Sequence, residues 1–135
     1  PVATYSCDLA WSKNPDEARD GAVYYIIPYQ YRDEVEYRSY VQGYVLPQFS
    51  GWIADGALTG YELYMNRYQA GAPWDSLFIQ HYRDMGAFGR RQLVTSKVRA
   101  GLQGNAAWKA WSDKKGQGGL CTESDNSIAE LIAHG

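Results

Sequence analysis

The sequence predicts an α+β fold, with helices on one face of an antiparallel sheet. Three stretches lead to this prediction. Ala22–Gln30 is a short apolar run of the kind that forms a covered strand. Arg32–Gly56 repeats its apolar residues at close to the 3.6-residue period of a helix. Leu58–Arg83 contains two strand-like runs, separated by the glycine and proline of a turn at residues 70–73.

The segment before the first strand, residues 1–21, is expected to form an N-terminal arm outside the core. Within it, Pro15 can open a short helix at residues 16–20, and Asn14 can cap that helix. The remaining residues, 22–135, are expected to form a single domain, because the whole chain has only the length of one.

The long helical stretch carries its own boundary signals. Asp33 and Glu34 stand in the first turn, where acidic side chains favour the positive end of the helix dipole. Pro47 removes a backbone donor and is expected to kink or split the helix. Gly56 is a suitable residue for the C-terminal end.

A second helical region follows the hairpin. It begins at Asp84 and places Val94, Val98 and Leu102 four residues apart. Asn105 can cap a further short helix that carries Trp108 and Trp111, and Ser127–Ala133 is expected to close the chain as a short strand. The order of elements is then β-α-β-β-α-β, which is the ferredoxin-like arrangement.

Side chains on the hairpin alternate between its two faces. We expect Tyr61, Leu63 and Met65 to share an aliphatic face with the second strand's Leu77 and Ile79. The opposite face is then aromatic and polar, and a sheet with helices on one side leaves such a face open to a partner subunit or a ligand. A ligand site is expected on that face, with Tyr64, Phe78, Gln80 and Tyr82, and with Tyr25 and His81 as further candidates.

The composition is that of a globular protein with unusually many aromatic residues, 12 Tyr and 5 Trp. Tyrosine is enriched at protein interfaces, which favours a homodimer or a larger homo-oligomer. Strands also favour tyrosine, so the composition alone does not establish an interface. The net charge of −2 argues against general nucleic-acid binding. The basic segment at residues 83–115 is expected to be a solvated helix face, because no aromatic–basic nucleic-acid motif accompanies it.

Two cysteines, Cys7 and Cys121, are too few for a zinc site, and no metal is expected. If the protein is exported, a disulfide could join them; otherwise they are unrelated thiols. The chain begins at Pro1, which either methionine removal or signal-peptide cleavage would produce. A periplasmic or secreted location is the expectation, with a cytoplasmic one as the alternative. No apolar run is long enough to span a membrane.

The runs YYIIPYQ and LTGYELYMNRY–GAPWDSLFIQHYRDM, with the proline-containing helix between them, resemble the dimeric α/β-barrel superfamily. More narrowly, they are similar to a group of bacterial proteins of unassigned function that often carry signal peptides. The resemblance covers residues 22–133. It implies that two subunits pack their sheets face to face, sometimes around a cavity. Some members of the superfamily are cofactor-independent monooxygenases, cyclases or haem-using enzymes, and others have no known reaction. The group's hairpin motif is matched here by Tyr68, Gly71, Trp74 and Asp75.

Candidates for chemistry are few. His81 could act as a base or a metal ligand, but its strand position matches Leu77 and Ile79, which favours a packed histidine. The sequence contains no GxSxG, HExxH or P-loop motif. An N-terminal proline can serve as a base, yet here about twenty residues precede the first expected strand, which argues against this role for Pro1.

Three classes of function remain, and the sequence does not decide whether the protein is an enzyme. The first is an assembly-forming protein without a recognisable catalytic site, which the tyrosine content favours. The second is a small enzyme, monooxygenase-like or cyclase-like, that holds a small apolar ligand without a tightly bound cofactor. The third is a haem or small-molecule binder that uses the same cavity.

Overall fold

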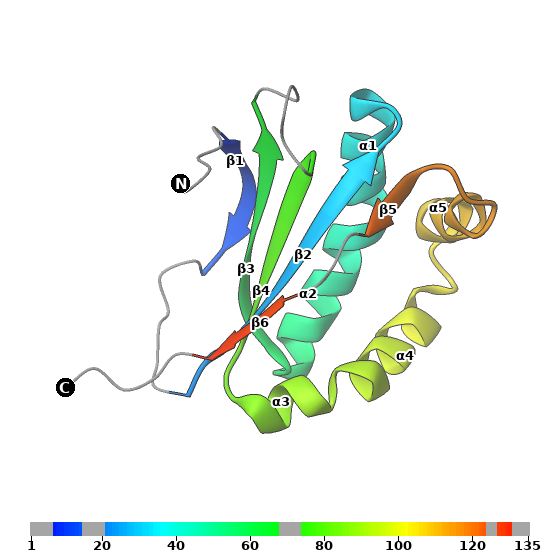
Figure 1. Ribbon diagram of the computed structural model, residues 1–135. Coiled ribbons are helices and arrows are strands. Elements are labelled where there is room, and N and C mark those ends of the chain that lie inside the picture. The colour runs from blue at the N-terminus through cyan, green and yellow to red at the C-terminus, as the bar shows by residue number, and fades with distance from the viewer. Residues whose placement is uncertain (1–6, 15–20, 68–73, 124–126, 131–135) are drawn as a thin grey trace.

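The computed structural model describes residues 7–14, 21–67, 74–123 and 127–130. In these residues the chain forms a sheet of six antiparallel strands with helices on one side of it (Figure 1), which confirms the predicted α+β class. The elements in chain order are β1 Cys7–Lys13, β2 Val23–Tyr31, α1 Glu34–Tyr40, the π-helical η1 Val41–Val45, α2 Leu46–Asp55, β3 Leu58–Asn66, β4 Ser76–Tyr82, α3 Met85–Gly89, α4 Arg91–Leu102, α5 Ala106–Gly116, β5 Cys121–Glu123 and β6 Ser127–Glu130.

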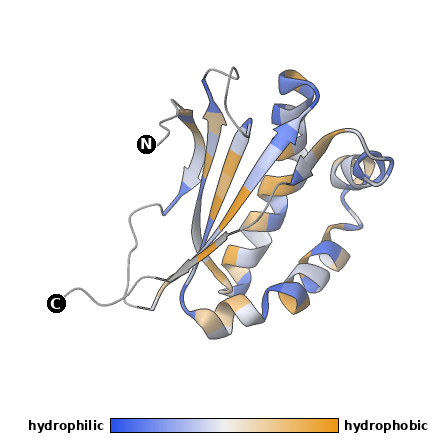
Figure 2. Ribbon diagram, in the orientation of Figure 1, coloured by the Kyte–Doolittle hydropathy of each residue, from blue (hydrophilic) through white to orange (hydrophobic). Residues whose placement is uncertain are grey.

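The strands follow the order β1-β3-β4-β2-β5, and β6 also pairs with β2. Helices α1 and α2, joined by η1, run along the sheet, while α3, α4 and α5 form an arc on the same side (Figure 1). Figure 2 shows hydrophobic residues on the central strands β2 and β4 and along α2. The core therefore lies between these strands and the first helical rod.

The segment expected to be an N-terminal arm contains a strand of the sheet, so that expectation is wrong for its middle part. Strand β1 pairs with β3 from Cys7 opposite Asn66 to Lys13 opposite Tyr61. The guanidinium of Arg38 on α1 lies 5.7 Å from the centre of the Trp11 ring, which ties this edge strand to a helix. The register of β1 against β3 shifts between Leu9 and Trp11, which interrupts the alternation of side chains between the two faces of the sheet. The sequence pattern therefore did not indicate this strand. The short helix expected at residues 16–20 falls outside the described residues.

Pro47 marks a boundary in the long helix without ending it. It lies in the first turn of α2, directly after the π-helical η1, in which the Leu46 N–H donates to the Val41 carbonyl five residues back. The wider π turn supplies a helix start at which a residue without an N–H is tolerated. Gly56 ends α2 in the left-handed conformation, with φ of 87°, as expected.

Helices α3 and α5 begin at capping residues: Asn105 caps α5 as predicted, and Asp84 caps α3 at the position where a helical region was predicted to begin. The Ala87 N–H donates to Asp84 Oδ1 over 2.7 Å at the start of α3, and the Trp108 N–H donates to Asn105 Oδ1 over 3.1 Å at the start of α5. Helix α4 packs on α2 through Val98, which lies so close to Gly51 that a Cβ atom there would be 2.6 Å from Val98 Cγ1.

The expected faces of the hairpin are wrong in one respect. Tyr61, Leu63 and Met65 do share a face, but they pair with Gln80, Phe78 and Ser76, so this mixed face is the one that the helices cover. Tyr64 pairs with Leu77 on the helix-free face. A strand's alternation fixes which of its own side chains share a face, but only the register between two strands decides which faces combine, and a one-residue shift reverses the result.

The proposed link between Cys7 and Cys121 does not form, and both residues are free thiols. They lie on β1 and β5, the two ends of the five-strand order. Four strand spacings separate those strands, roughly 19 Å, whereas a disulfide needs Cα atoms within about 7 Å. In the described parts of the chain, no helix combines the length and apolar character needed to cross a bilayer.

Candidate functional site

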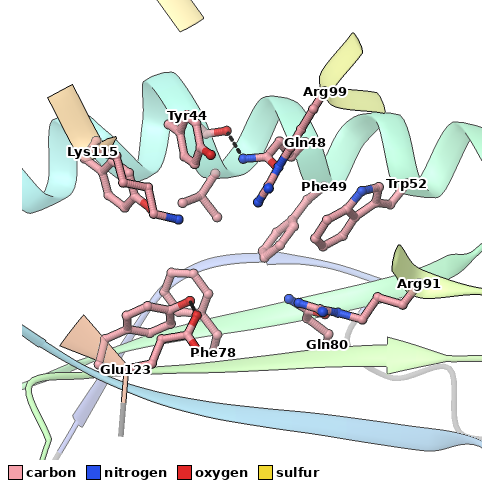
Figure 3. A pocket seen from close by; sticks show the side chains of 13 residues that line it. Tyr44, Gln48, Phe49, Trp52, Phe78, Gln80, Arg91, Arg99, Lys115 and Glu123 are labelled. Carbon is pink, nitrogen blue, oxygen red and sulfur yellow. Dashed lines mark hydrogen bonds between the residues drawn. The ribbon is translucent and has the colours of Figure 1, made fainter. Parts of the chain in front are cut away.

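A cleft lies between η1 and α2 on one side and the strands β2 and β4 on the other (Figure 3). Water can enter about 60 Å³ of it, which is room for about four water molecules. Its lining residues come from the sheet and from five helical segments: Tyr29, Tyr40, Tyr44, Val45, Gln48, Phe49, Trp52, Phe78, Gln80, Arg91, Arg99, Lys115 and Glu123.

The walls of the cleft are largely aromatic. Tyr44, Phe49 and Trp52 project from one face of the helical rod because they are spaced by about one and two helical turns. The Phe49 ring lies 5.3 Å from Trp52 and 6.0 Å from Phe78 of the sheet, and Phe78 in turn lies 4.5 Å from Tyr29. These ring contacts pack the helical wall of the cleft against its sheet wall.

Three cationic side chains enter the cleft from α4 and α5 (Figure 3). The guanidinium of Arg91 lies 4.8 Å from the centre of the Tyr25 ring, and Lys115 Nζ lies 5.0 Å from that of Tyr44. Arg99 Nε donates to Gln48 Oε1 over 2.8 Å. Glu123 is the only carboxylate among the described residues that line the cleft, so the lining carries a net charge of +2.

Two buried donors at the cleft have no hydrogen-bond partner within the described residues: Trp52 Nε1 and Arg91 Nε. Buried polar groups in folded proteins are nearly always paired, and an unpaired one calls for a bound molecule or another explanation. Both residues line the cleft. The site thus offers donors beyond those that its own structure satisfies.

The hydroxyl groups near the cleft are neutral at physiological pH. Burial raises the pKa of Tyr82 to about 12, although Arg91 opposes this, and Tyr82 donates to Gln80 Oε1 over 2.5 Å. Burial, followed by the charge of Glu123, raises the pKa of Tyr29 above its ordinary value. The described lining contains no His, Cys or Ser. Its side chains can therefore bind and orient a molecule, and none of them forms a nucleophile–base pair.

A second polar cluster lies on the helix-free face of the sheet. His81 Nε2 and Glu62 Oε1 are 2.9 Å apart, Tyr64 donates its hydroxyl proton to the same carboxylate, and the Tyr24 ring meets His81 edge-on at 5.0 Å. The hydrogen bond to Glu62, with burial, raises the pKa of Tyr64 to about 12. His81 is 3% exposed, and its Nδ1 has no partner within the described residues.

The residues predicted for a single ligand site are divided between the two faces. Phe78 and Gln80 line the helix-side cleft, and Tyr25 and Tyr82 adjoin it through Arg91. Tyr64 and His81 lie on the opposite face. Among the described residues, no group of His, Cys, Asp and Glu side chains is arranged to hold a metal ion.

The cations of the cleft were missed by sequence reasoning. All three lie in the basic segment at residues 83–115, so their charge is visible in the sequence. The interpretation of that segment as a solvated helix face fits Lys97 and Lys109, whose side chains are 76% and 52% exposed. It also fits Arg99 and Lys115, which are exposed although they line the cleft, and it fails for Arg91, which is partly buried.

Comparison with known proteins gives similarity at the level of structure. No family model and no curated protein matches the chain. The chain is similar to the "putative monooxygenase" of Lactobacillus acidophilus NCFM, with 13% identity and a TM-score of 0.47 over 86% of this chain; the match spans 46% of that protein's length. It is also similar to a dimeric protein of unknown function and ferredoxin-like fold from Bacteroides fragilis NCTC 9343, with 12% identity and a TM-score of 0.42 over 84% of this chain and 98% of the other.

Proposed function

We propose that two copies of this chain pair through the helix-free faces of their sheets to form a homodimer. In this proposal β2, β3, β4 and β6, with the helices between them, form the ferredoxin-like β-α-β-β-α-β unit, while β1 and β5 are additions to it. Two such sheets packed face to face would make a dimeric α/β barrel. The proposal rests on the apolar character of the helix-free face.

That face carries an apolar patch on the neighbouring strands β2 and β4, next to the polar cluster of Glu62, Tyr64 and His81. Ile26 and Pro28 of β2 pair with Ile79 and Leu77 of β4, and all four are only partly buried. Leu9 on β1, across Tyr64 of β3 from Leu77, adds an apolar side chain at the sheet edge and is 51% exposed. Contiguous apolar surface of this kind marks an interaction site, and a closed dimer covers the same patch on both copies.

Oligomeric state tests the proposal directly. Ile79→Glu places a charge in the centre of the patch, and Leu9→Glu places one at its exposed edge. Both are expected to convert a dimer to a monomer in light scattering coupled to gel filtration. Leu93→Glu is the matched control, because Leu93 lies on α4 and is 74% exposed. A wild-type chain that is monomeric at tens of micromolar would contradict the proposal. Leu9→Glu changes an exposed side chain, so a monomer of this variant cannot be attributed to misfolding of a buried strand.

A second function, the binding of a small molecule, is favoured by the cleft on the helix side. The observation that supports it is the pair of buried, unpartnered donors beside aromatic walls. This role is compatible with the dimer because the cleft and the apolar patch lie on opposite faces of the sheet. The space in this cleft that water can enter, about 60 Å³, is far too small for a porphyrin, and the haem alternative, which was placed on the open sheet face, stays a prediction.

Ligand binding can be tested with a library of small fragments observed by NMR. Trp52 Nε1–H is the reporter, because it lines the cleft and is unpartnered within the described residues. Its indole resonance, assigned with Trp52→Phe, is expected to shift with fragments that bind. Val45→Phe narrows the cleft and should abolish these shifts. If no fragment moves the Trp52 resonance, or if Val45→Phe leaves the shifts unchanged, the cleft is not a binding site.

A further inference from the structure

We propose that the ligand of the cleft is a small planar organic anion, of which an aromatic carboxylate is the simplest example. Its negative group lies between Arg91 and Arg99, and its ring lies against the aromatic walls. This inference rests on the proposed small-molecule binding and adds the chemical class of the ligand.

The cations of the cleft differ from their neighbours on the same helices. Lys97 pairs with Asp55 at 3.0 Å, Lys114 pairs with Glu36 at 3.0 Å, and Lys109 pairs with Asp113 at 3.4 Å. Within the described residues, the three cations that line the cleft, Arg91, Arg99 and Lys115, have no carboxylate partner. On α4 and α5, the cations away from the cleft are thus neutralised by nearby carboxylates, and those that line the cleft are left for another group.

The arginines that enter the cleft are held by neutral contacts. Arg99 is positioned through Nε by Gln48, whose own amide donates to the Tyr44 carbonyl over 3.1 Å. Arg91 is held between two rings, 4.8 Å from Tyr25 and 5.7 Å from Trp52. A guanidinium presents several donors in a planar fork, so an arginine fixed through one edge retains donors that match a carboxylate.

The position of Glu123 indicates which end of the cleft takes the anion. In Figure 3 Glu123 lies at the opposite end from Arg91, near Lys115. A carboxylate on the ligand would be repelled by Glu123 and attracted to the arginines. The anionic group is therefore placed at the arginine end.

The walls favour a flat ligand over a bare inorganic anion. Phe49 and Phe78 meet edge to face, with ring centres 6.0 Å apart, and Tyr44 and Trp52 continue the helical wall on either side. Aromatic surfaces interact well with a planar ring. The space that water can enter, about 60 Å³, is smaller than the roughly 150 Å³ of a cavity that encloses benzene, so the cleft buries only part of such a ligand.

Benzoate and benzamide form a matched pair of probes, because they have the same shape and differ in charge. We would follow their binding to the wild-type protein through the Trp52 indole resonance and by calorimetry. Benzoate is expected to bind about tenfold or more tightly than benzamide, since hydrogen bonds to an ionised group are about twice as strong. Inorganic phosphate, an anion without a ring, is expected to bind more weakly than benzoate.

Charge variants separate the two proposals. Arg99→Gln is expected to weaken benzoate binding about tenfold and to leave benzamide binding unchanged. Arg91→Gln should act in the same direction. Lys97→Gln removes the same charge from an outward position of α4, 76% exposed, and should change neither affinity.

Three other results would each overturn part of the inference about the ligand. Equal binding of benzoate and benzamide at Trp52, insensitive to Arg99→Gln, would overturn the anion inference and retain ligand binding. Tighter binding of phosphate than of benzoate would overturn the requirement for a planar ring. Failure of all three probes to shift the Trp52 resonance at millimolar concentration overturns the anion inference, and the fragment library then decides separately whether the cleft binds other molecules.

Discussion

Trp108 donates its indole N–H to the backbone carbonyl of Tyr44 over 3.1 Å, and the two rings stack with their centres 5.1 Å apart. The contact joins α5 to the π-helical η1, at the point where the backbone of the long helix departs from regular α geometry. Trp108 is 1% exposed. This one side chain therefore fixes both the position of α5 and the wall of the cleft that Tyr44 forms.

Trp108→Phe should keep part of the stacking and lose the hydrogen bond. We expect the free energy of unfolding to fall by about 2–3 kcal/mol, from the lost hydrogen bond and lost packing volume, while the Tyr44 carbonyl keeps the Gln48 amide as a donor. Urea denaturation followed by circular dichroism would measure it. Trp111→Phe is the control, since Trp111 is only partly buried. An equal loss in both variants would show that the hydrogen bond to Tyr44 is not decisive.

Gly51→Ala should destabilise the contact between α2 and α4, although alanine favours helices. The added Cβ would lie 2.6 Å from Val98 Cγ1, so one helix must move. We expect a loss of about 1–3 kcal/mol in urea denaturation. Gly101→Ala is the matched control, because nothing lies within 4 Å of its added Cβ; it should stabilise by up to about 1 kcal/mol.

The pair Gly51→Ala and Val98→Ala supplies a direct check on this explanation. The double variant should recover part of the stability that Gly51→Ala loses, because it removes the clashing methyl groups. Strictly additive losses would mean that the two residues do not compete for the same space.

Two tyrosines should make the protein less stable at alkaline pH. The hydrogen bond to Glu62 raises the pKa of Tyr64 to about 12, and burial raises that of Tyr82 to about 12. In the unfolded chain a tyrosine loses its proton near pH 10. The stabilising contribution is therefore complete below pH 10 and is lost as the pH rises toward 12.

Unfolding midpoints in urea at pH 8, 10 and 11 would measure this loss. In both Tyr64→Phe and Glu62→Gln, the unfolding midpoint should decline less steeply above pH 10 than in the wild type. Tyr64→Phe removes the titrating group, and Glu62→Gln removes the charge that opposes its ionisation. Identical slopes in all three proteins would exclude Tyr64 as a contributor.

The two thiols should react independently. Intact mass after alkylation under denaturing, non-reducing conditions is expected to show two labels, because Cys7 and Cys121 are free. In the folded protein Cys7 should react first, since it is exposed, while burial raises the pKa of the Cys121 thiol and lowers its thiolate fraction. An unlabelled chain would instead show a disulfide and would contradict the sheet order.

The sequence by itself determined the features that depend on neighbouring residues. The caps at Asn105 and Asp84 and the left-handed end at Gly56 lie where local hydrogen bonding and backbone freedom require them. The α+β class could be predicted for the same reason, because hydrophobic periodicity reports each helix and strand separately.

Only the tertiary structure decided which surfaces meet. The register of β3 against β4 placed Phe78 and Gln80 under the helices and left Tyr64 and His81 on the other face. The packing of α4 on α2 brought Arg91 and Arg99 to the cleft, while Lys97 lies away from it. Both arrangements depend on contacts between residues far apart in the chain. The free-energy difference between alternative strand registers comes from the side chains that one element buries against another, and a local sequence pattern does not contain this information.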